Sequence, residues 1–101
     1  MVRSVFFHPL ARADLFSLYD FIEQQSGPER AGAYLDRIRR LCMSLADLPE
    51  RTVPRDDLVP GLRTVALERR LLVALTVTDT VVTILRVLYA GCDLSAQDVP
   101  L

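Results

Sequence analysis

The stretch from Thr80 to Asp93 constrains the fold more than any other part of this sequence, which reads TVVTILRVLYAGCD there. Almost every residue before Ala90 is β-branched, aliphatic or aromatic, which favours a β-strand. A regular alternation would divide its side chains between one face with Val81, Thr83, Leu85, Val87 and Tyr89 and another with Val82, Ile84, Arg86 and Leu88. Both faces are mainly apolar, as is typical of a strand covered on both sides. We predict a central strand with helices over one face and a further, unidentified cover over the second.

Arg86 is the one charge inside this apolar strand. An unpaired charge is costly to bury, so an arginine in such a position is normally paired with a carboxylate. Arg86 is therefore either half of a structural ion pair or the polar group of a binding site. The same two interpretations apply to Arg63, and Asp14 is expected to be an ion-pair or capping partner rather than a catalyst.

Two amphipathic helices are predicted in the first half of the chain. Apolar residues recur at helical spacing from Pro9 to Gln25, and again from Pro28 to Leu48. Gly27 can end the first helix, and Pro28 suits the first turn of the second. Two amphipathic helices joined by a short turn form an antiparallel hairpin.

The remaining segments predict strands around this hairpin. Val2 to Phe7 is expected to form a first strand, and the proline-rich stretch from Glu50 to Gly61 a loop. Leu62 to Leu67 and Leu71 to Val77 are then expected to form an antiparallel meander with the central strand. The predicted fold is a single α+β domain over residues 1–101, with the element order β-α-α-β-β-β and the helical hairpin on one face of an antiparallel sheet. The tail from residue 94 to residue 101 has no clear periodicity.

Composition limits the possible functions. The formal net charge is −1 and all twelve cationic side chains are arginines, so we expect no general affinity for nucleic acid and no lysine-based catalysis. Half of the residues are hydrophobic, yet no apolar run approaches the roughly 18 residues that a membrane span needs. The excess apolar surface is expected to meet another protein. Two cysteines make no disulfide framework, and a cytoplasmic location is the default.

Four segments, taken in chain order, resemble parts of the ParE/RelE toxin superfamily. HPLARADL at 8–15 with YDFI at 19–22 is similar to its first helix, and Ala31, Tyr34 and residues 38–49 are similar to its second. RDDLVPGLR at 55–63 resembles the loop before the second strand in the ParE branch, and ILRVLYAGCDL at 84–94 resembles the closing strand. The resemblance covers the chain from about Ser4 to Leu94. It implies a toxin of a type II toxin–antitoxin module, held inactive by an antitoxin whose C-terminal segment wraps around it.

The resemblance leaves two mechanisms to compare, because ParE-like members poison DNA gyrase and RelE-like members cut mRNA on the ribosome. RNA cleavage needs a base, an acid and cations that stabilise the transition state. RelE-like enzymes supply these with lysines and arginines on the sheet, but here only Arg63, Arg86 and Tyr89 remain. Cys92 stands where the family often has an arginine. The residues therefore favour binding without catalysis, and no catalytic residue is predicted.

The resemblance further implies a ribbon-helix-helix antitoxin as partner and DNA gyrase as target, with no cofactor, no metal, no direct binding of nucleic acid and no membrane. An amphipathic antitoxin segment would lie in an apolar groove and could add a strand at a sheet edge. The predicted surface for antitoxin or target consists of Leu62, Arg63, Val82, Ile84, Arg86, Leu88 and Tyr89. Two alternatives stay open: a RelE-type mRNA endonuclease, and a non-toxic α+β interaction module or homodimer.

Other polar residues have simpler interpretations. His8 before Pro9 is expected at the start of the first helix. Cys42 falls on the apolar stripe of the second helix and should behave as a small hydrophobic residue. Asp56 and Asp57 lie in a loop rich in proline. They are expected to stabilise turns rather than to bind a metal.

Overall fold

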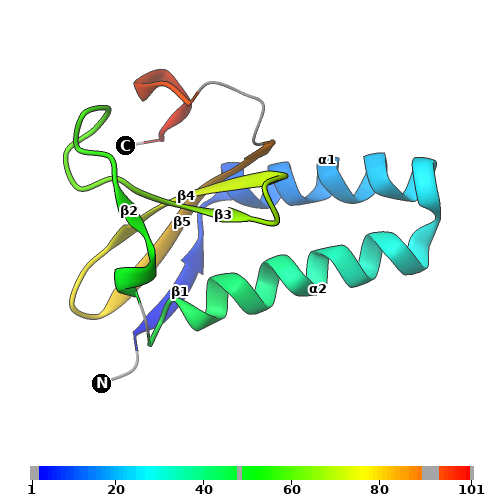
Figure 1. The fold of residues 1–101 in the computed structure, drawn as a ribbon, viewed down its shortest axis with the longest axis horizontal. Coiled ribbons are helices and arrows are strands. Elements are labelled where there is room, and N and C mark those ends of the chain that lie inside the picture. The colour runs from blue at the N-terminus through cyan, green and yellow to red at the C-terminus, as the bar shows by residue number, and fades with distance from the viewer. Residues whose placement is uncertain (1–2, 48, 90–93, 101) are drawn as a thin grey trace.

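The computed structural model describes residues 3–47, 49–89 and 94–100. Its helices and strands are β1 (Ser4–Phe7), α1 (Pro9–Ser26), α2 (Pro28–Ser44), β2 (Val53–Pro54), β3 (Arg63–Leu67), β4 (Leu71–Val77) and β5 (Val81–Tyr89) (Figure 1). The five strands form one sheet in the order β1-β5-β4-β3-β2. The predicted α+β class and the order of the main elements are confirmed.

The sheet is mixed rather than wholly antiparallel. β3, β4 and β5 form the predicted antiparallel meander, whereas β1 pairs with β5 in parallel, from Ser4 opposite Val81 to Phe7 opposite Ile84. β2 is an additional short strand within the predicted loop of residues 50–61, with Val53 opposite Thr64. It forms because the loop folds back on itself, as the backbone N–H of Arg55 donates to the carbonyl of Leu62 at 2.7 Å.

The helical hairpin follows its local sequence signals closely. His8 caps α1, since its Nδ1 accepts a hydrogen bond from the backbone N–H of Leu10 at 3.0 Å. Gly27 separates the helices with φ at +92°, a conformation that suits glycine. α2 ends at Ser44, before the predicted end at Leu48, because the chain changes there to tighter turns: the N–H groups of Leu45 and Ala46 donate to carbonyls three residues back. Leu48 itself lies outside the described residues.

The main core lies between the hairpin and one face of the sheet. It joins buried side chains of both helices with those of β4 and β5: Ala11, Leu18, Tyr34, Ile38, Cys42, Leu45, Leu71, Val73, Leu75, Val82, Ile84 and Val87. This arrangement confirms that the hairpin packs on one sheet face.

A β-bulge in β5 changes which side chains share a face. Arg86 lies opposite Ala74 and Ile84 lies opposite Leu75, so Leu85 is an extra residue in the strand. Beyond the bulge, Val87 joins Val82 and Ile84 in the helix-side core. The predicted regular alternation was therefore wrong after residue 84, because one inserted residue reverses the parity of everything that follows.

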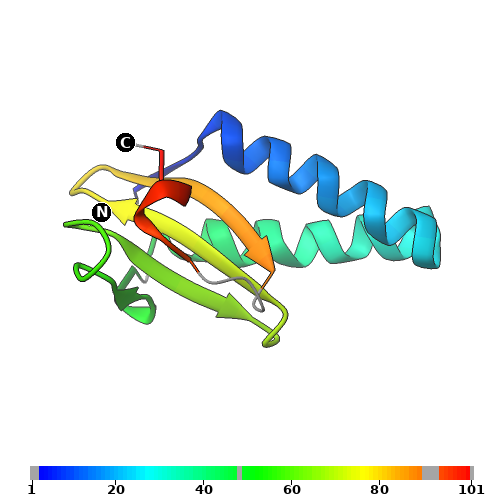
Figure 2. The same cartoon turned by 90° about the horizontal axis from the view of Figure 1, so that it is seen from above.

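The second sheet face is also covered, and its cover comes from the chain itself. A smaller core there consists of Val59, Leu62, Ala74, Leu85 and Val99, flanked by Leu58 and Leu94. The C-terminal segment, residues 94–100, lies in front of the sheet in Figure 2, while α2 passes behind it. Among the described residues, no helix is long and apolar enough to cross a membrane.

Candidate functional site

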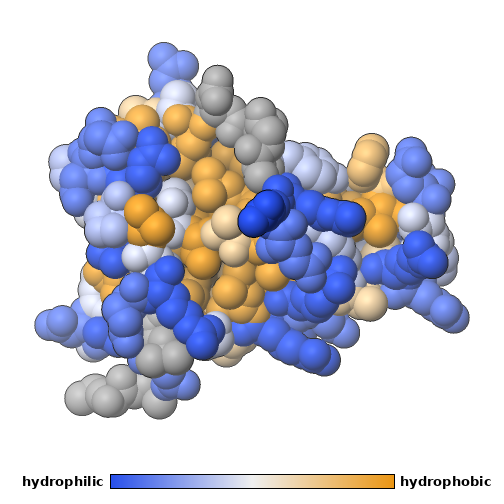
Figure 3. Space-filling model, in the orientation of Figure 1, coloured by the Kyte–Doolittle hydropathy of each residue, from blue (hydrophilic) through white to orange (hydrophobic). Residues whose placement is uncertain are grey.

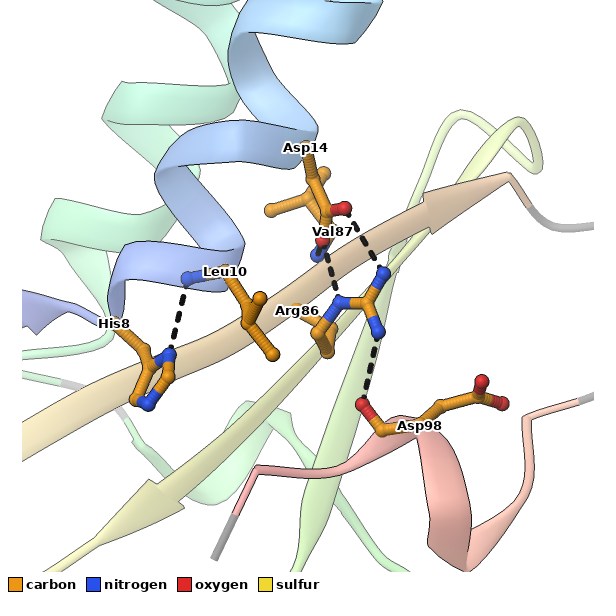
Figure 4. Close-up of polar contacts among 6 residues, drawn as sticks. All are labelled: His8, Leu10, Asp14, Arg86, Val87 and Asp98. Atoms are coloured by element: carbon orange, nitrogen blue, oxygen red, sulfur yellow. Dashed lines mark hydrogen bonds and ion pairs between the residues drawn. The ribbon is translucent and has the colours of Figure 1, made fainter.

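Arg86 is held in a network that links three parts of the chain (Figure 4). Its Nε and Nη2 donate to the two carboxylate oxygens of Asp14 on α1, at 2.8 and 3.0 Å, and its Nη1 donates to the carbonyl of Asp98 at 3.0 Å. Asp14 also accepts a hydrogen bond from the backbone N–H of Val87 at 3.0 Å. The hydrogen bond to Asp14 raises the pKa of Arg86, so the guanidinium stays charged. Arg86 and Asp14 thus form a structural ion pair, which is the first of the two interpretations that the sequence left open for Arg86.

Arg63 has hydrogen-bond partners that carry no charge. Its Nε donates to the hydroxyl of Thr52 and its Nη2 to the Thr52 carbonyl at 2.9 Å. In the antiparallel register Arg63 lies opposite Leu75, which belongs to the helix-side core, whereas Arg86 lies opposite Ala74, which belongs to the other core. Cross-strand partners share a face, so the two arginines extend from opposite faces and form no common cationic cluster.

The other residues of the predicted contact surface differ widely in exposure. Leu62, Val82 and Ile84 are completely buried and belong to the two cores. Leu88 is half-buried, and Tyr89 is exposed at 45%. Among these seven residues, only Arg63, Arg86, Leu88 and Tyr89 keep surface that a partner could contact.

The remaining polar candidates have structural partners. Cys42 is completely buried, and burial raises its pKa to about 12, so it is no nucleophile at neutral pH. Asp56 accepts a hydrogen bond from the backbone N–H of Gly61 at 2.8 Å, and Asp57 pairs with Arg55 at 3.0 Å. The hydrogen bond from Arg55 lowers the pKa of Asp57. No group of three potential metal ligands occurs within the described part of the chain. Cys92 and Asp93 lie outside it.

A cavity lies along the side of the hairpin that faces the end of β5. We call it the arginine groove; its volume is about 640 Å³ and it is lined by Leu18, Phe21, Ile22, Gln25, Ser26, Arg30, Ala33, Tyr34, Asp36, Arg37, Arg40, Arg70 and Tyr89. Four arginines and one carboxylate therefore surround an apolar and aromatic floor. In Figure 3 hydrophilic side chains lie where the β3–β4 turn meets the hairpin, as they also do in other patches of this face.

A second groove lies on a different side of the hairpin. We call it the outer groove; its volume is about 420 Å³ and it is lined by Arg12, Leu15, Phe16, Tyr19 and Leu35. Phe16 is the most exposed large hydrophobic side chain described, at 75%. Folding alone gives no reason for an exposed phenylalanine beside an apolar groove, whereas a protein partner would bury it.

The sequence reasoning missed the arginine groove. Its signal was present in α2, where Arg30, Arg37 and Arg40 follow the spacing i, i+7 and i+10 and therefore form one stripe. The fourth arginine, Arg70, comes from the turn between β3 and β4. Only the tertiary fold brings that turn to the hairpin.

Comparisons with known proteins agree with this fold. A family model described as "ParE toxin of type II toxin-antitoxin system, parDE" matches residues 5–93. A solved structure described as "Chromosomal ParDE TA system from P. aeruginosa" is similar at 29% sequence identity, with a TM-score of 0.75 over 87% of this chain and 96% of that chain. A search of curated proteins found no match.

Proposed function

The chain belongs to the ParE toxin family of type II toxin–antitoxin systems, and on that premise we propose that it inhibits DNA gyrase by binding to it and is neutralised by a cognate antitoxin. The proposed place of action is the cytoplasm, where gyrase works. Family membership over residues 5–93 is the observation that carries this proposal.

The arrangement of the cationic side chains supports binding rather than catalysis. Cleavage of RNA needs cations that converge on one phosphate. Arg86 is occupied by Asp14 and the carbonyl of Asp98, and Arg63 extends from the opposite sheet face. The three residues that remained for a nuclease, Arg63, Arg86 and Tyr89, therefore form no catalytic cluster in this conformation.

The outer groove suits an antitoxin helix. An amphipathic helix binds by laying its apolar residues into a hydrophobic groove, and Leu15, Phe16 and Leu35 provide such a surface between the two helices. We place the antitoxin, proposed to be of the ribbon-helix-helix type, in this groove. Of the surface that the sequence predicts for antitoxin or target, the accessible parts of Arg63 and Leu88 are placed further along the wrapping antitoxin, and Tyr89 is left for the target.

The proposal is tested by DNA supercoiling with purified gyrase, in parallel with an mRNA cleavage assay on programmed ribosomes. We expect loss of supercoiling, accumulation of cleaved DNA and intact mRNA. Supercoiling should recover when the antitoxin encoded beside the toxin is added in equimolar amount. Cut mRNA with unaffected gyrase would support the RelE-type alternative. If neither gyrase nor mRNA is affected, toxicity through gyrase and toxicity through mRNA cleavage are both refuted.

A further inference from the structure

We propose that the arginine groove is the surface that receives the target, and that it binds an acidic segment of the target protein that also carries apolar side chains. This inference rests on the gyrase inhibition proposed above and specifies which surface performs it. It differs from the antitoxin contact, which we place in the outer groove; no residue lines both grooves.

Charge is the first argument for this occupant. Four of the twelve arginines line a single groove, although the chain as a whole has a net charge of −1. A local concentration of one sign in a cleft focuses the electric field and attracts the opposite charge. Arginine in particular binds carboxylates through two parallel hydrogen bonds. The four arginines, which we call the rim of the groove, therefore favour an acidic group as the ligand.

The charges of the rim are also free to exchange partners. Arg37 lies 3.3 Å from Glu68, but both side chains are exposed by more than 40%, so this pair contributes little to stability. A carboxylate of a partner can replace Glu68 at small cost. For Arg30, Arg40 and Arg70 no ion pair is recorded among the described residues.

The floor of the groove provides the second argument. Phe21 and Tyr89 meet edge to face, with ring centroids 6.0 Å apart, and yet remain exposed at 53% and 45%. Large aromatic side chains that stay half exposed beside arginines have the composition of an interface hot spot. Burial of these two rings by apolar side chains of the partner would supply the hydrophobic part of the binding energy.

Backbone conformation at the edge of the groove gives a third, independent argument. Glu68 and Arg69 form the turn between β3 and β4 with φ at +53° and +60°, which is unfavourable for residues other than glycine. This turn places Arg70 in the groove. Strained residues of this kind concentrate at binding sites, where the strain has a use.

A protein segment fits the groove better than a nucleic acid does. Nucleic acid would find arginines and aromatic rings here as well, but the net charge of −1 gives the chain no general attraction for phosphate backbones. The apolar part of the floor, Leu18, Ile22 and Ala33, suits aliphatic side chains. We therefore assign the groove to an acidic protein segment and treat nucleic acid as an outcome of the test.

Two neighbouring arginines of α2 provide a matched pair of variants. Arg40 lines the arginine groove, whereas Arg39 is exposed and does not. Arg40→Glu and Arg39→Glu change the net charge equally, in the same helix, and both positions are exposed. We expect Arg40→Glu to raise the concentration needed for half-inhibition of gyrase at least tenfold and Arg39→Glu to change it less than twofold. Both variants should keep the circular dichroism spectrum and melting temperature of the wild type, and Arg40→Glu should still bind the antitoxin.

The possible failures are distinguishable. If the wild type does not inhibit gyrase, the proposed function and this inference both fall. If it inhibits and the two variants are equally affected, only the inference is overturned. A photo-crosslinking amino acid at position 33 should capture a gyrase peptide rich in Asp and Glu, and capture of a peptide without acidic residues would contradict the proposal. Binding of a single-stranded oligothymidylate that is lost in Arg40→Glu but not in Arg39→Glu would assign the groove to nucleic acid instead.

Discussion

Arg86 and Asp14 show how a single ion pair can connect distant parts of this small fold. Asp14 accepts hydrogen bonds from the Arg86 side chain and from the backbone N–H of Val87, so it joins α1 to β5 beyond the end of β1. Arg86 in turn holds the carbonyl of Asp98 in the C-terminal segment. Both side chains are largely buried, at 21% and 16% exposure, so neither has free access to water when its partner is lost.

Removal of Asp14 alone should therefore destabilise the protein more than removal of both partners. We expect Asp14→Ala to lower the free energy of unfolding by about 3 kcal/mol, because it leaves Arg86 as an uncompensated and partly buried charge. The double variant Asp14→Ala/Arg86→Met should lose less than Asp14→Ala alone. Urea denaturation of both proteins measures the difference.

Asp20→Ala is a suitable control for this pair. Asp20 is an exposed carboxylate on the same helix, so its removal should change the free energy of unfolding by less than about 0.5 kcal/mol. An unfolding free energy for Asp14→Ala equal to that of Asp20→Ala would show that the ion pair contributes nothing to stability.

Among the elements, the β3–β4 hairpin is the one whose sequence opposes its conformation. Arg70 donates its backbone N–H to the carbonyl of Leu67 at 2.9 Å and so closes a β-turn within the connection of residues 68–70, since Leu67 lies opposite Leu71. Both central residues of this β-turn, Glu68 and Arg69, have positive φ, and turns with positive φ at both central positions strongly prefer Asn-Gly or Asp-Gly. The element therefore forms because the flanking strands pair along five residues of β3, from Arg63 to Leu67, and not because the turn favours it.

Arg69→Gly should consequently stabilise the protein. Glycine adopts positive φ without steric cost, so we expect the free energy of unfolding to rise by about 1 kcal/mol. Arg69→Ala removes the same side chain but keeps a β-carbon, and should give no such gain. Equal thermal denaturation curves for the two variants would contradict the role of backbone strain in this turn.

On the scale of the whole molecule, the C-terminal segment works as the second cover of the sheet. Val99 is buried against Val59, Leu62, Ala74 and Leu85, on the face opposite the helical hairpin. The short 3₁₀ turn Ala96–Asp98 before it is fixed by a capping box between Ser95 and Asp98. The sheet is thus covered on both faces by parts of its own chain.

Replacement of Val99 should expose this second core. We expect Val99→Asp to lower the free energy of unfolding by about 3 kcal/mol, because a carboxylate without a partner would replace an apolar contact. The exposed face should also increase the fluorescence of a hydrophobic dye such as ANS. Gln97→Asp, at an exposed position of the same segment, should change neither the unfolding curve nor the dye signal.

The sequence by itself determined the main elements and the fold class of this protein. The helical hairpin, the meander of β3 to β5 and the interpretations of His8, Cys42 and Asp14 follow from local signals: a proline at each helix start, a glycine between the helices, and apolar periodicity. Such signals act between residues that are close in the chain, so one sequence is sufficient to recognise them. Several of these elements together also carried the resemblance to the ParE family.

The tertiary structure decided what lies at the surface. The bulge at Leu85 reversed the faces of β5 beyond residue 84. The two cores took up Leu62, Val82 and Ile84, which had been predicted to lie on the contact surface. The arginine groove combines residues of α1 and α2 with Arg70 and Tyr89 from the sheet. Periodicity predicts which side chains of an element share a face, but not what that face packs against. A single inserted residue also changes which side chains share the face. Exposure and the joining of distant side chains are therefore properties of the folded chain, and the proposed binding surface depends on both.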